Sequence, residues 1–490
     1  MPDWYEKLEA LFEQQIGKGE MAGTAYDTAW VASVPDPEQP DRPAFPQALE
    51  WLRLHQNSDG SWGSEVEYYH DHVLSTLIAC IVLAEWHPDE WAEYQVSAGL
   101  KAIWQKIVGL KRDPSITVGF ELILPTMLRR AESLGFQLPY ACFNGYRSLR
   151  SNKLALIPPN LVYSRYVTST FSLEFLGDEV STSRLNDNII EDNGSVACSP
   201  SASSFYVRTV GGARTFRYLK DIVAHARGAI PALAPIDIYE RIWALNNLYL
   251  VRESFPPEVQ PHLEALAALW SIKGVSFGRF YSVPDLDNTT VSFTLLTRCG
   301  HQLDPIAFTP FERENHFVCY QYEQDPSPSL HVHLVEALSL VGPSKDRDRM
   351  LNKALQFLDR SRVYETFWFD KWHSSPYYTT AHAIIGVSRI EPRLIENAIT
   401  WLIQTQRPDG SWGYLESTAE ETAYALQALL YYQRHIGPIP GSTIKQGIDY
   451  LTKSAELRQV KYTPLWLSKT LYTPTWIVHS TVLSALAMAG

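Results

Sequence analysis

Residues 48–63 read ALEWLRLHQNSDGSWG, and residues 398–413 read AITWLIQTQRPDGSWG, with nine of the sixteen positions identical. Each copy has the pattern of an apolar-striped helix that runs into a Gln, an Asp-Gly turn and a Trp. The dipeptides Asp59-Gly60 and Asp409-Gly410 predict tight turns, because glycine accepts positive φ and Asp hydrogen-bonds the local backbone. We expect the Gln and Trp to tie each turn to a neighbouring helix. Long repeats of this kind indicate stacked helical units with a shared core, and a degenerate third copy, EDNGSVACS, lies at residues 191–199.

Helical periodicity dominates the rest of the chain, as in residues 72–86, 238–251, 379–390 and 420–433. A length of 490 residues suggests about three domains, or two large helical ones. The stretch 211–235, with paired prolines near its end, is the best candidate for a boundary. Two helical domains then carry one GSWG copy each.

Composition and charge exclude several classes of function. A net charge of -12 argues against a nucleic-acid partner, whose phosphates would require clustered Lys and Arg. The five cysteines contain no CxxC pair, so neither a disulfide framework nor a zinc site is expected. The N-terminus has no signal-peptide pattern, and the longest strongly apolar stretch, residues 77–84, is far shorter than a transmembrane segment of about 20 residues. We expect a cytoplasmic protein without a transmembrane segment.

The residues that carry chemistry lie in PDLDNTT, residues 284–290, where Asp285 and Asp287 precede a helix-like run. One interpretation is an ordinary helix N-cap, because Asp, Asn and Thr favour that position. The other is an acid site. Two carboxyl groups in one apolar cavity cannot both ionise cheaply, so one can stay protonated at neutral pH and act as a Brønsted acid. Protonation of an alkene needs such an acid, a dry cavity and aromatic faces that stabilise a carbocation.

The chain resembles the class II diterpene cyclases of the bacterial type, such as copalyl, halimadienyl and kolavenyl diphosphate synthases, over nearly all of its length. The matching stretches are long and follow the family's order. They include AYDTAWVA (25–32), FPQALEWLRLHQNSDGSWG (45–63), YYHDHVLSTL (68–77), GFELILP (119–125), YERIWALNN (239–247), DLDNTT (285–290), DKWHSSPYYTTAHA (370–383), DGSWGYLESTAEETAYALQAL (409–429) and LWLSKTLYTP (465–474).

This resemblance implies an all-α fold of two (α/α) barrels, called the β and γ domains, with the active site between them. Residues 1–20 and 236–490 would form the β domain, and residues 21–235 the inserted γ domain. Such enzymes protonate the terminal alkene of a linear isoprenoid diphosphate, usually geranylgeranyl diphosphate, and cyclise it to a bicycle that retains the diphosphate. We therefore expect a diterpene cyclase whose product is used by a class I terpene synthase or a phosphatase.

The resemblance also implies roles for single residues. The family's DxDD motif maps onto residues 285–288, which makes Asp287 the general acid and Asp285 a supporting residue. Asn288 stands where the family usually has a further Asp, and its amide can donate a hydrogen bond that orients Asp287. Ser329 and His333 match positions from which related cyclases hydrogen-bond the acid; in squalene-hopene cyclases a His does this.

The diphosphate site is less well marked. The candidates for substrate binding are Lys111, Arg112, Lys371, Lys469, Glu174, Trp372 and Tyr378. Lys111 and Arg112 form a basic pair in place of the acidic stretch of plant members, and could bind the diphosphate as a point charge and a fork. Mg²⁺ is expected to arrive through the substrate diphosphate. The sequence contains no Asp-Asp dipeptide, so the DDxxD motif of class I terpene synthases is absent.

Three other functions stay open at this point: a drimenyl-type cyclase that uses farnesyl diphosphate, an inverting glycosidase on an (α/α) barrel, and a non-catalytic helical repeat scaffold. For the product, the missing fourth Asp favours a rearranged skeleton such as kolavenyl diphosphate, because some bacterial relatives without that Asp rearrange their substrate.

Overall fold

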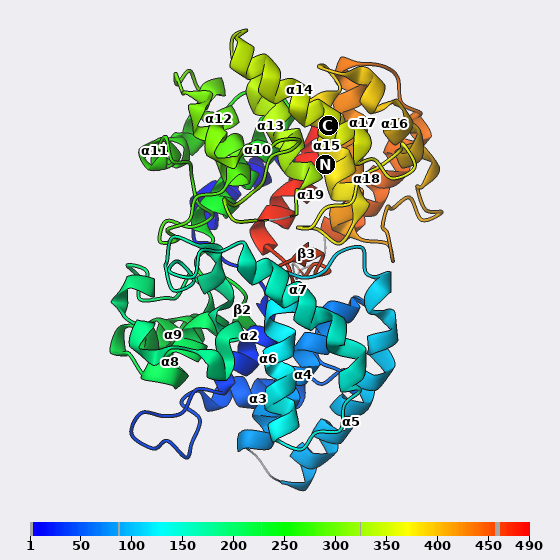
Figure 1. The fold of residues 1–490 in the computed structure, drawn as a ribbon. Helices are drawn as coiled ribbons and strands as arrows, with labels where there is room; N and C mark the ends of the chain where they lie inside the picture. The colour runs from blue at the N-terminus through cyan, green and yellow to red at the C-terminus, as the bar shows by residue number, and fades with distance from the viewer. Residues whose placement is uncertain (1–2, 87–88, 227, 324, 456–460) are drawn as a thin grey trace.

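The computed structural model describes residues 3–86, 89–226, 228–323, 325–455 and 461–490. The described chain is mainly helical, which confirms the predicted all-α class (Figure 1). Strand in these residues is limited to two short antiparallel pairs, β1–β2 and β3–β4. The α-helices are α1 (Trp4–Gln14), α2 (Ala25–Ala32), α3 (Pro46–Leu54), α4 (Tyr69–Trp86), α5 (Glu90–Lys106), α6 (Phe120–Ser133), α7 (Asn144–Ala155), α8 (Pro200–Val210), α9 (Ala213–His225), α10 (Asp237–Arg252), α11 (Gln260–Leu269), α12 (Leu286–Arg298), α13 (Pro328–Ser339), α14 (Lys345–Arg360), α15 (Pro376–Val387), α16 (Glu396–Gln404), α17 (Ala419–His435), α18 (Gly441–Ala455) and α19 (Thr475–Ala489).

The strands are β1 (Gly23–Thr24), β2 (Ile230–Pro231), β3 (Trp466–Leu467) and β4 (Leu471–Tyr472), and short 3₁₀ segments such as η1 (Ile107–Arg112) and η3 (Thr168–Glu179) link the helices.

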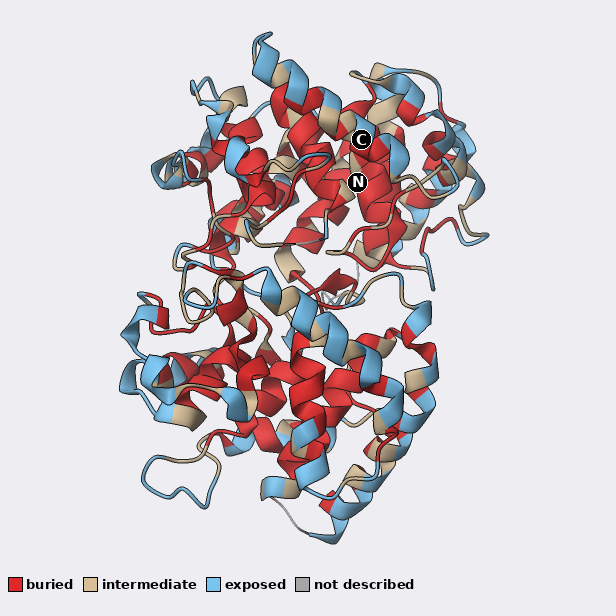
Figure 2. Cartoon of the chain, viewed as in Figure 1, coloured by how far each residue is buried: buried red, intermediate tan, exposed pale blue. Residues whose placement is uncertain are grey.

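Two large hydrophobic cores divide the chain, and a small third cluster joins the two units through Val66, Tyr68, Leu465, Leu467 and Leu471. The core of the upper unit in Figure 1 joins side chains of α1 to side chains from residue 238 onward. The core of the lower unit is built from residues 25–236, together with Phe277, Tyr281 and Val283. Each unit has a buried interior and an exposed outer surface (Figure 2). The boundaries near residues 20 and 235 stay a prediction, and we propose the upper and lower units as the β and γ domains.

The first GSWG copy fastens three elements of the lower unit. Gln56 donates through Nε2 to the carbonyl of Gly60 (2.8 Å) and to the carbonyl of Gln95 on α5 (2.9 Å). The indole N–H of Trp62 donates to the carbonyl of Leu52 on α3 (2.8 Å). The turn needs glycine, because Gly60 has a φ of +87° and an added Cβ would lie 2.7 Å from a backbone oxygen of α5.

The second copy repeats these contacts in the upper unit. Gln406 donates to the carbonyls of Gly410 (3.0 Å) and Thr443 (2.9 Å), and the indole of Trp412 donates to the carbonyl of Leu402 (2.7 Å). Both Trp side chains are fully buried. The expected clasp between turn and helix is confirmed in both units.

The degenerate third copy has the same turn. Ser195 donates to the side chain of Asn193 (2.6 Å), as Ser61 does to Asp59 in the first copy (2.6 Å). A further copy has no GSWG signature at all. The indole of Trp368 donates to the carbonyl of Leu358 (2.8 Å), ten residues earlier, as in the other Trp copies. The sequence did not reveal this copy because its turn lacks the Asp-Gly dipeptide.

The repeated turn also positions the acid motif. In the first GSWG copy the backbone N–H after the turn donates to a Thr hydroxyl of the following helix, from Trp62 to Thr76 of α4 (2.9 Å). Val275 makes the equivalent bond to Thr289 of α12 (2.9 Å). The start of α12, which carries PDLDNTT, is therefore fixed by the same device as the buried helix α4.

Candidate active site

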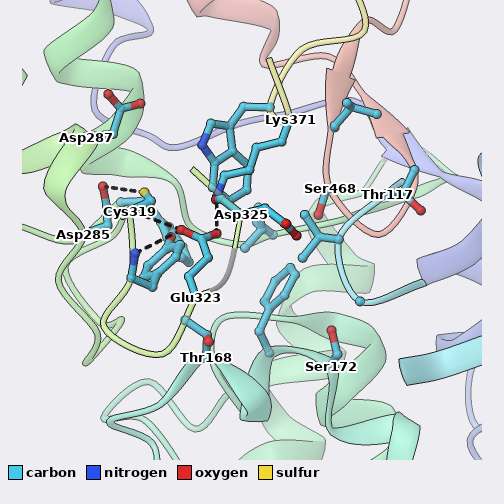
Figure 3. A pocket seen from close by; sticks show the side chains of 18 of the residues that line it. Thr117, Thr168, Ser172, Asp285, Asp287, Cys319, Glu323, Asp325, Lys371 and Ser468 are labelled. Carbon is cyan, nitrogen blue, oxygen red and sulfur yellow. Dashed lines mark hydrogen bonds and ion pairs between the residues drawn. The ribbon is translucent and has the colours of Figure 1, made fainter. Parts of the chain in front are cut away.

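A pocket of about 440 Å³ lies where the two units meet. Both units contribute to its wall, and the β3–β4 hairpin of the upper unit supplies Trp466, Leu467 and Tyr472. Figure 3 shows Asp285 and Asp287 on one side of this pocket, with Thr117 and Ser468 on the other. Asp285 is 1% exposed, whereas Asp325 is exposed and Lys371 half-buried, so the pocket has a deep acidic end and a solvent-facing mouth.

Asp285 serves both as a helix cap and as a member of the site. It is the N-cap of α12, where its Oδ1 accepts the backbone N–H of Asn288 (2.7 Å). The side-chain amide of Asn288 donates to the other oxygen, Oδ2 (2.7 Å). The expectation that Asn288 orients Asp287 is therefore wrong, because one helical turn brings its amide back to Asp285.

The environment of Asp285 favours its protonated form. Burial raises the pKa of this carboxyl, the two hydrogen bonds from Asn288 lower it, and the negative charges of Asp287 and Glu323 raise it again, to a net value of about 8. Asp285 consequently retains its proton at neutral pH. The neutral carboxyl of the acid interpretation is therefore found at Asp285, two residues before Asp287, which the resemblance assigns as the general acid.

Asp287 lines the pocket and contacts a histidine. Its Oδ1 lies 2.6 Å from Nδ1 of His333, which is buried on α13. Burial alone would lower the pKa of His333, but the charge and hydrogen bond of Asp287 outweigh it, and the pKa is raised. His333 thus lies where the sequence places it. Ser329 does not contact the acid as predicted. Its backbone N–H donates to Asp370 (2.8 Å), and its hydroxyl lies 3.1 Å from that of Ser327.

Aromatic side chains form much of the wall between the acid and the mouth. Trp372 and Tyr378, both predicted to contact substrate, lie in it. Ring faces carry partial negative charge and stabilise cations, particularly where water is excluded. Further members of this aromatic wall are Phe171, Tyr239, Phe277, Tyr281 and Trp466.

Two lysines lie at the mouth, and each is paired with a carboxylate. Lys371 of the upper unit pairs with Glu323 and also donates to the backbone carbonyl of Asp325. Lys153 of the lower unit pairs with Glu121. Sequence reasoning singled out Lys371 but missed Lys153 and Glu121. Glu121 lies in the quoted segment GFELILP, whereas Lys153 lies in a polar helix without any signal of its own.

The basic pair Lys111 and Arg112 is not part of this pocket. Both side chains are exposed at the end of η1, and neither lines the wall. The following residue, Asp113, accepts the backbone N–H of His70 (2.8 Å) and contacts its ring (2.7 Å), which fixes the turn against α4. The predicted diphosphate role of the pair is thus not supported by its position.

Lys469 and Glu174 also lie outside the pocket wall, where they form a buried ion pair with each other. Nζ of Lys469 lies 2.6 Å from Glu174, 2.9 Å from Ser199 and 2.7 Å from Ser201. Lys469 is 1% exposed and Glu174 is fully buried. Ser468 lines the pocket, but the next side chain enters the lower unit. The prediction that these two residues bind substrate is wrong.

The described residues contain no group of three or more His, Cys, Asp or Glu side chains that could hold a metal ion by itself. The mouth nevertheless offers carboxylate oxygens from Glu121, Glu323 and Asp325. Mg²⁺ commonly takes one or two carboxylates and completes its shell with phosphate oxygens and water, so a single carboxylate at this mouth has the donor chemistry for a magnesium diphosphate. Among the described helices, none has the length and apolar character needed to cross a bilayer.

Comparison with known proteins gives a consistent result. Residues 320–463 match the family model of the squalene-hopene cyclase C-terminal domain. A type B diterpene cyclase of Mycobacterium tuberculosis is 36% identical, over 98% of this chain and 97% of its own length. A (−)-kolavenyl diphosphate synthase of Tripterygium wilfordii is 30% identical over 75% of this chain, which spans 47% of that plant protein.

Solved structures match this fold over nearly the whole chain. The ent-copalyl diphosphate synthase of Streptomyces platensis superposes with a TM-score of 0.83 and 25% identity, over 99% of both chains. The ent-copalyl diphosphate synthase of Arabidopsis thaliana, at 23% identity, has a TM-score of 0.73 over 98% of this chain and 62% of its own. The latter is evidence for the α-barrel fold alone.

Proposed function

Because the chain belongs to the class II diterpene cyclases, we propose that it cyclises geranylgeranyl diphosphate to a bicyclic diterpenyl diphosphate, with Asp287 as the proton donor. The observation that carries this proposal is the polarity of the pocket: an acid held by a histidine at the deep end, aromatic walls, and two lysines at the mouth. Membership in this family sets aside the glycosidase and the scaffold.

The diphosphate is proposed to bind at the mouth, between Lys153 and Lys371. In the substrate-free protein each lysine is neutralised by a carboxylate, Glu121 or Glu323. A diphosphate competes for both ammonium groups, and the released carboxylates would then hold Mg²⁺ on the diphosphate oxygens. The metal would supply neutralisation of the diphosphate charge. We therefore infer an exchange of partners at the mouth upon binding.

With the diphosphate at the mouth, the hydrocarbon tail extends into the aromatic part of the pocket and brings the terminal alkene to Asp287. Asp287 donates its proton to the alkene, and His333 stabilises the carboxylate that forms. The rings of Trp372 and Tyr378 then face the cationic chain as it closes. Loss of a proton from carbon ends the reaction, and the diphosphate stays attached.

For the product we propose kolavenyl diphosphate, a rearranged skeleton. The support is the departure from DxDD at Asn288 and the similarity to a relative named for that product. Because the diphosphate is retained, the next enzyme must either ionise or hydrolyse it, which is the chemistry of a class I terpene synthase or a phosphatase. Farnesyl diphosphate, with a shorter tail, is the alternative substrate.

Incubation with each diphosphate and Mg²⁺, followed by dephosphorylation and mass spectrometry, tests substrate and product together. We expect conversion of geranylgeranyl diphosphate and its loss in Asp287→Asn. Asp41→Asn is the matched control, because Asp41 is exposed and outside the pocket wall. Undiminished conversion by folded Asp287→Asn would refute the acid assignment. A copalyl or halimadienyl product would refute the kolavenyl proposal while leaving the acid in place.

The mouth is tested with lysine variants. Removal of a charged hydrogen-bond donor costs about 1.5–3 kcal/mol, so Lys153→Ala and Lys371→Ala are each expected to raise KM on the order of 10- to 100-fold. Lys111→Ala is the control, because Lys111 is exposed and does not line the pocket. A larger effect on KM from Lys111→Ala than from the other two would place the diphosphate at the basic pair instead.

A further inference from the structure

A second histidine stands behind the acid and its partner. Nε2 of His333 lies 2.9 Å from Nδ1 of His382, which belongs to α15. Asp287, His333 and His382 thus form one hydrogen-bonded row that crosses from α12 through α13 to α15. The His382 ring is half-buried, packs against Tyr378 at 4.5 Å between centroids, and is not part of the pocket wall. Its place in the row gives it no contact with substrate.

The direction of these hydrogen bonds decides whether Asp287 can act as an acid. To protonate an alkene, Asp287 must carry its proton on the oxygen that does not face His333. The oxygen bonded to His333 must therefore accept, and Nδ1 of His333 must donate. If Nδ1 were the acceptor, the carboxyl proton would point at His333 and not at the substrate. Only a His333 with a proton on Nδ1 is productive.

Full protonation of His333 guarantees that direction. Once Asp287 is itself protonated, its charge no longer raises the pKa of His333, so the imidazolium then depends on an acceptor for its second N–H. An imidazolium donates from both nitrogens, and a buried N–H without a partner is costly. Nδ1 of neutral His382 is the only side-chain acceptor that lies within hydrogen-bond distance of Nε2 among the described residues. Burial, followed by the charges of His333 and His373, keeps the pKa of His382 well below its ordinary range, so His382 stays neutral and can accept.

We propose that His382 is a positioning residue that holds His333 in its doubly protonated form, so that Asp287 keeps its reactive proton directed at the substrate. This role rests on the proposed function of Asp287. After the proton leaves, the same imidazolium faces the new carboxylate, and no further group has to move.

Charged and titratable groups face the row from several elements. Asp285, Cys319 and Tyr239 lie near Asp287. Glu336 lies one turn further along α13 and is bound to Arg298 of α12 (2.6 Å). The face that α14 packs against α13 is apolar. The remaining groups around the two rings are Tyr378 on α15, Tyr424 and Glu420 on α17, and Asp370 and His373 in the segment before α15.

The protonation state of His333 can be measured directly from the ¹⁵N resonances of labelled histidine, assigned by their loss in His333→Gln. In the unaltered protein we expect both ring nitrogens of His333 to be protonated at pH 7. His382→Leu keeps the volume and removes the acceptor. It is expected to lower the midpoint of the His333 titration by about one to two pH units, because a hydrogen bond to a charged group is lost. The high-pH limb of the kcat profile moves with it.

His382→Asn is the matched variant, because Oδ1 of Asn takes the place of Nδ1 and can accept. It is expected to restore the midpoint and the kcat profile. A singly protonated His333 at pH 7 in the unaltered protein overturns the proposal without any variant, and so does an unchanged midpoint in folded His382→Leu. The titration needs no substrate. Failure of the protein to convert geranylgeranyl diphosphate, with the expected midpoints observed, would instead count against the proposed function.

Discussion

Replacement of Lys469 by Met is expected to destabilise the protein strongly, although Lys469 does not contact the pocket. The side chain crosses from the β3–β4 hairpin of the upper unit into the lower unit, where it neutralises Glu174. Met keeps the length of the aliphatic stem and removes only the charge and the three donors. The Glu174 carboxylate then remains buried without a counter-charge.

The magnitude follows from the burial of the pair. Both side chains are at most 1% exposed, so solvent does not screen their interaction. Loss of one partner of a buried pair costs about 3–5 kcal/mol, whereas neutral replacement of both partners is often close to neutral. The double variant Lys469→Met, Glu174→Gln is therefore expected to recover most of the loss. Its Gln also keeps an acceptor for the hydroxyl of Tyr26, which donates to Glu174 (2.9 Å).

Thermal denaturation followed by circular dichroism and Trp fluorescence measures both variants. At about 2–4 °C per kcal/mol for a unit of roughly 200 residues, the single variant should lose on the order of 10 °C. KM for geranylgeranyl diphosphate should stay unchanged in the fraction that is folded. Equal losses in the single and double variants would refute the buried-pair reasoning. An unchanged midpoint with a raised KM would show that Lys469 binds the diphosphate.

Three further predictions concern the acid motif and the clasp. The Asp285 carboxyl has a pKa of about 8 in the folded protein and an ordinary pKa of about 3.9 in the unfolded chain, so the free energy of unfolding falls as pH rises between these values. Asp285→Asn should remove this pH dependence, which is measured by comparing melting temperatures at about pH 5 and about pH 9. Asn288→Asp should steepen the slope, because it replaces the amide that donates to Asp285 by another acid. Trp412→Phe should cost about 1–3 kcal/mol in denaturant titrations, since the carbonyl of Leu402 loses its buried donor; a loss below the resolution of the titration would show that the indole hydrogen bond adds nothing.

Much of the fold could be predicted from local pattern. Helical periodicity and the Asp-Gly turns are properties of short stretches, and the structure places a helix at 69–86, 237–252 and 419–435, close to the predicted limits. The copy at Trp368 was missed because Thr366 stands where the first copy has Gly60, and the residues with positive φ are instead Tyr364 and Glu365, at +49° and +56°. Pattern recognition depends on the residue type, whereas the hydrogen bond of Trp368 depends only on the path of the backbone.

The site was predictable where residues are neighbours in sequence or lie in matching motifs. Asp285 and Asp287 share one turn, so the sequence alone places them together. The sequence could not rank the candidate lysines for binding of the diphosphate, because it does not show whether a lysine lies at the mouth of a pocket or inside a core. Lys371 lies at the mouth, Lys111 is exposed, and Lys469 is buried in an ion pair.

The sequence by itself determined the family, the helical class, the repeated clasp and the acid pair, because each is written in contiguous residues. Only the tertiary structure decided which distant side chains meet: His333 with Asp287 across 46 residues, His382 behind it, and Glu121 with Lys153 at the mouth. The GSWG segments fasten helices and contribute no acid. The pocket forms where two separately cored units meet, and the partners of a charge there depend on the packing of helices far apart in the chain.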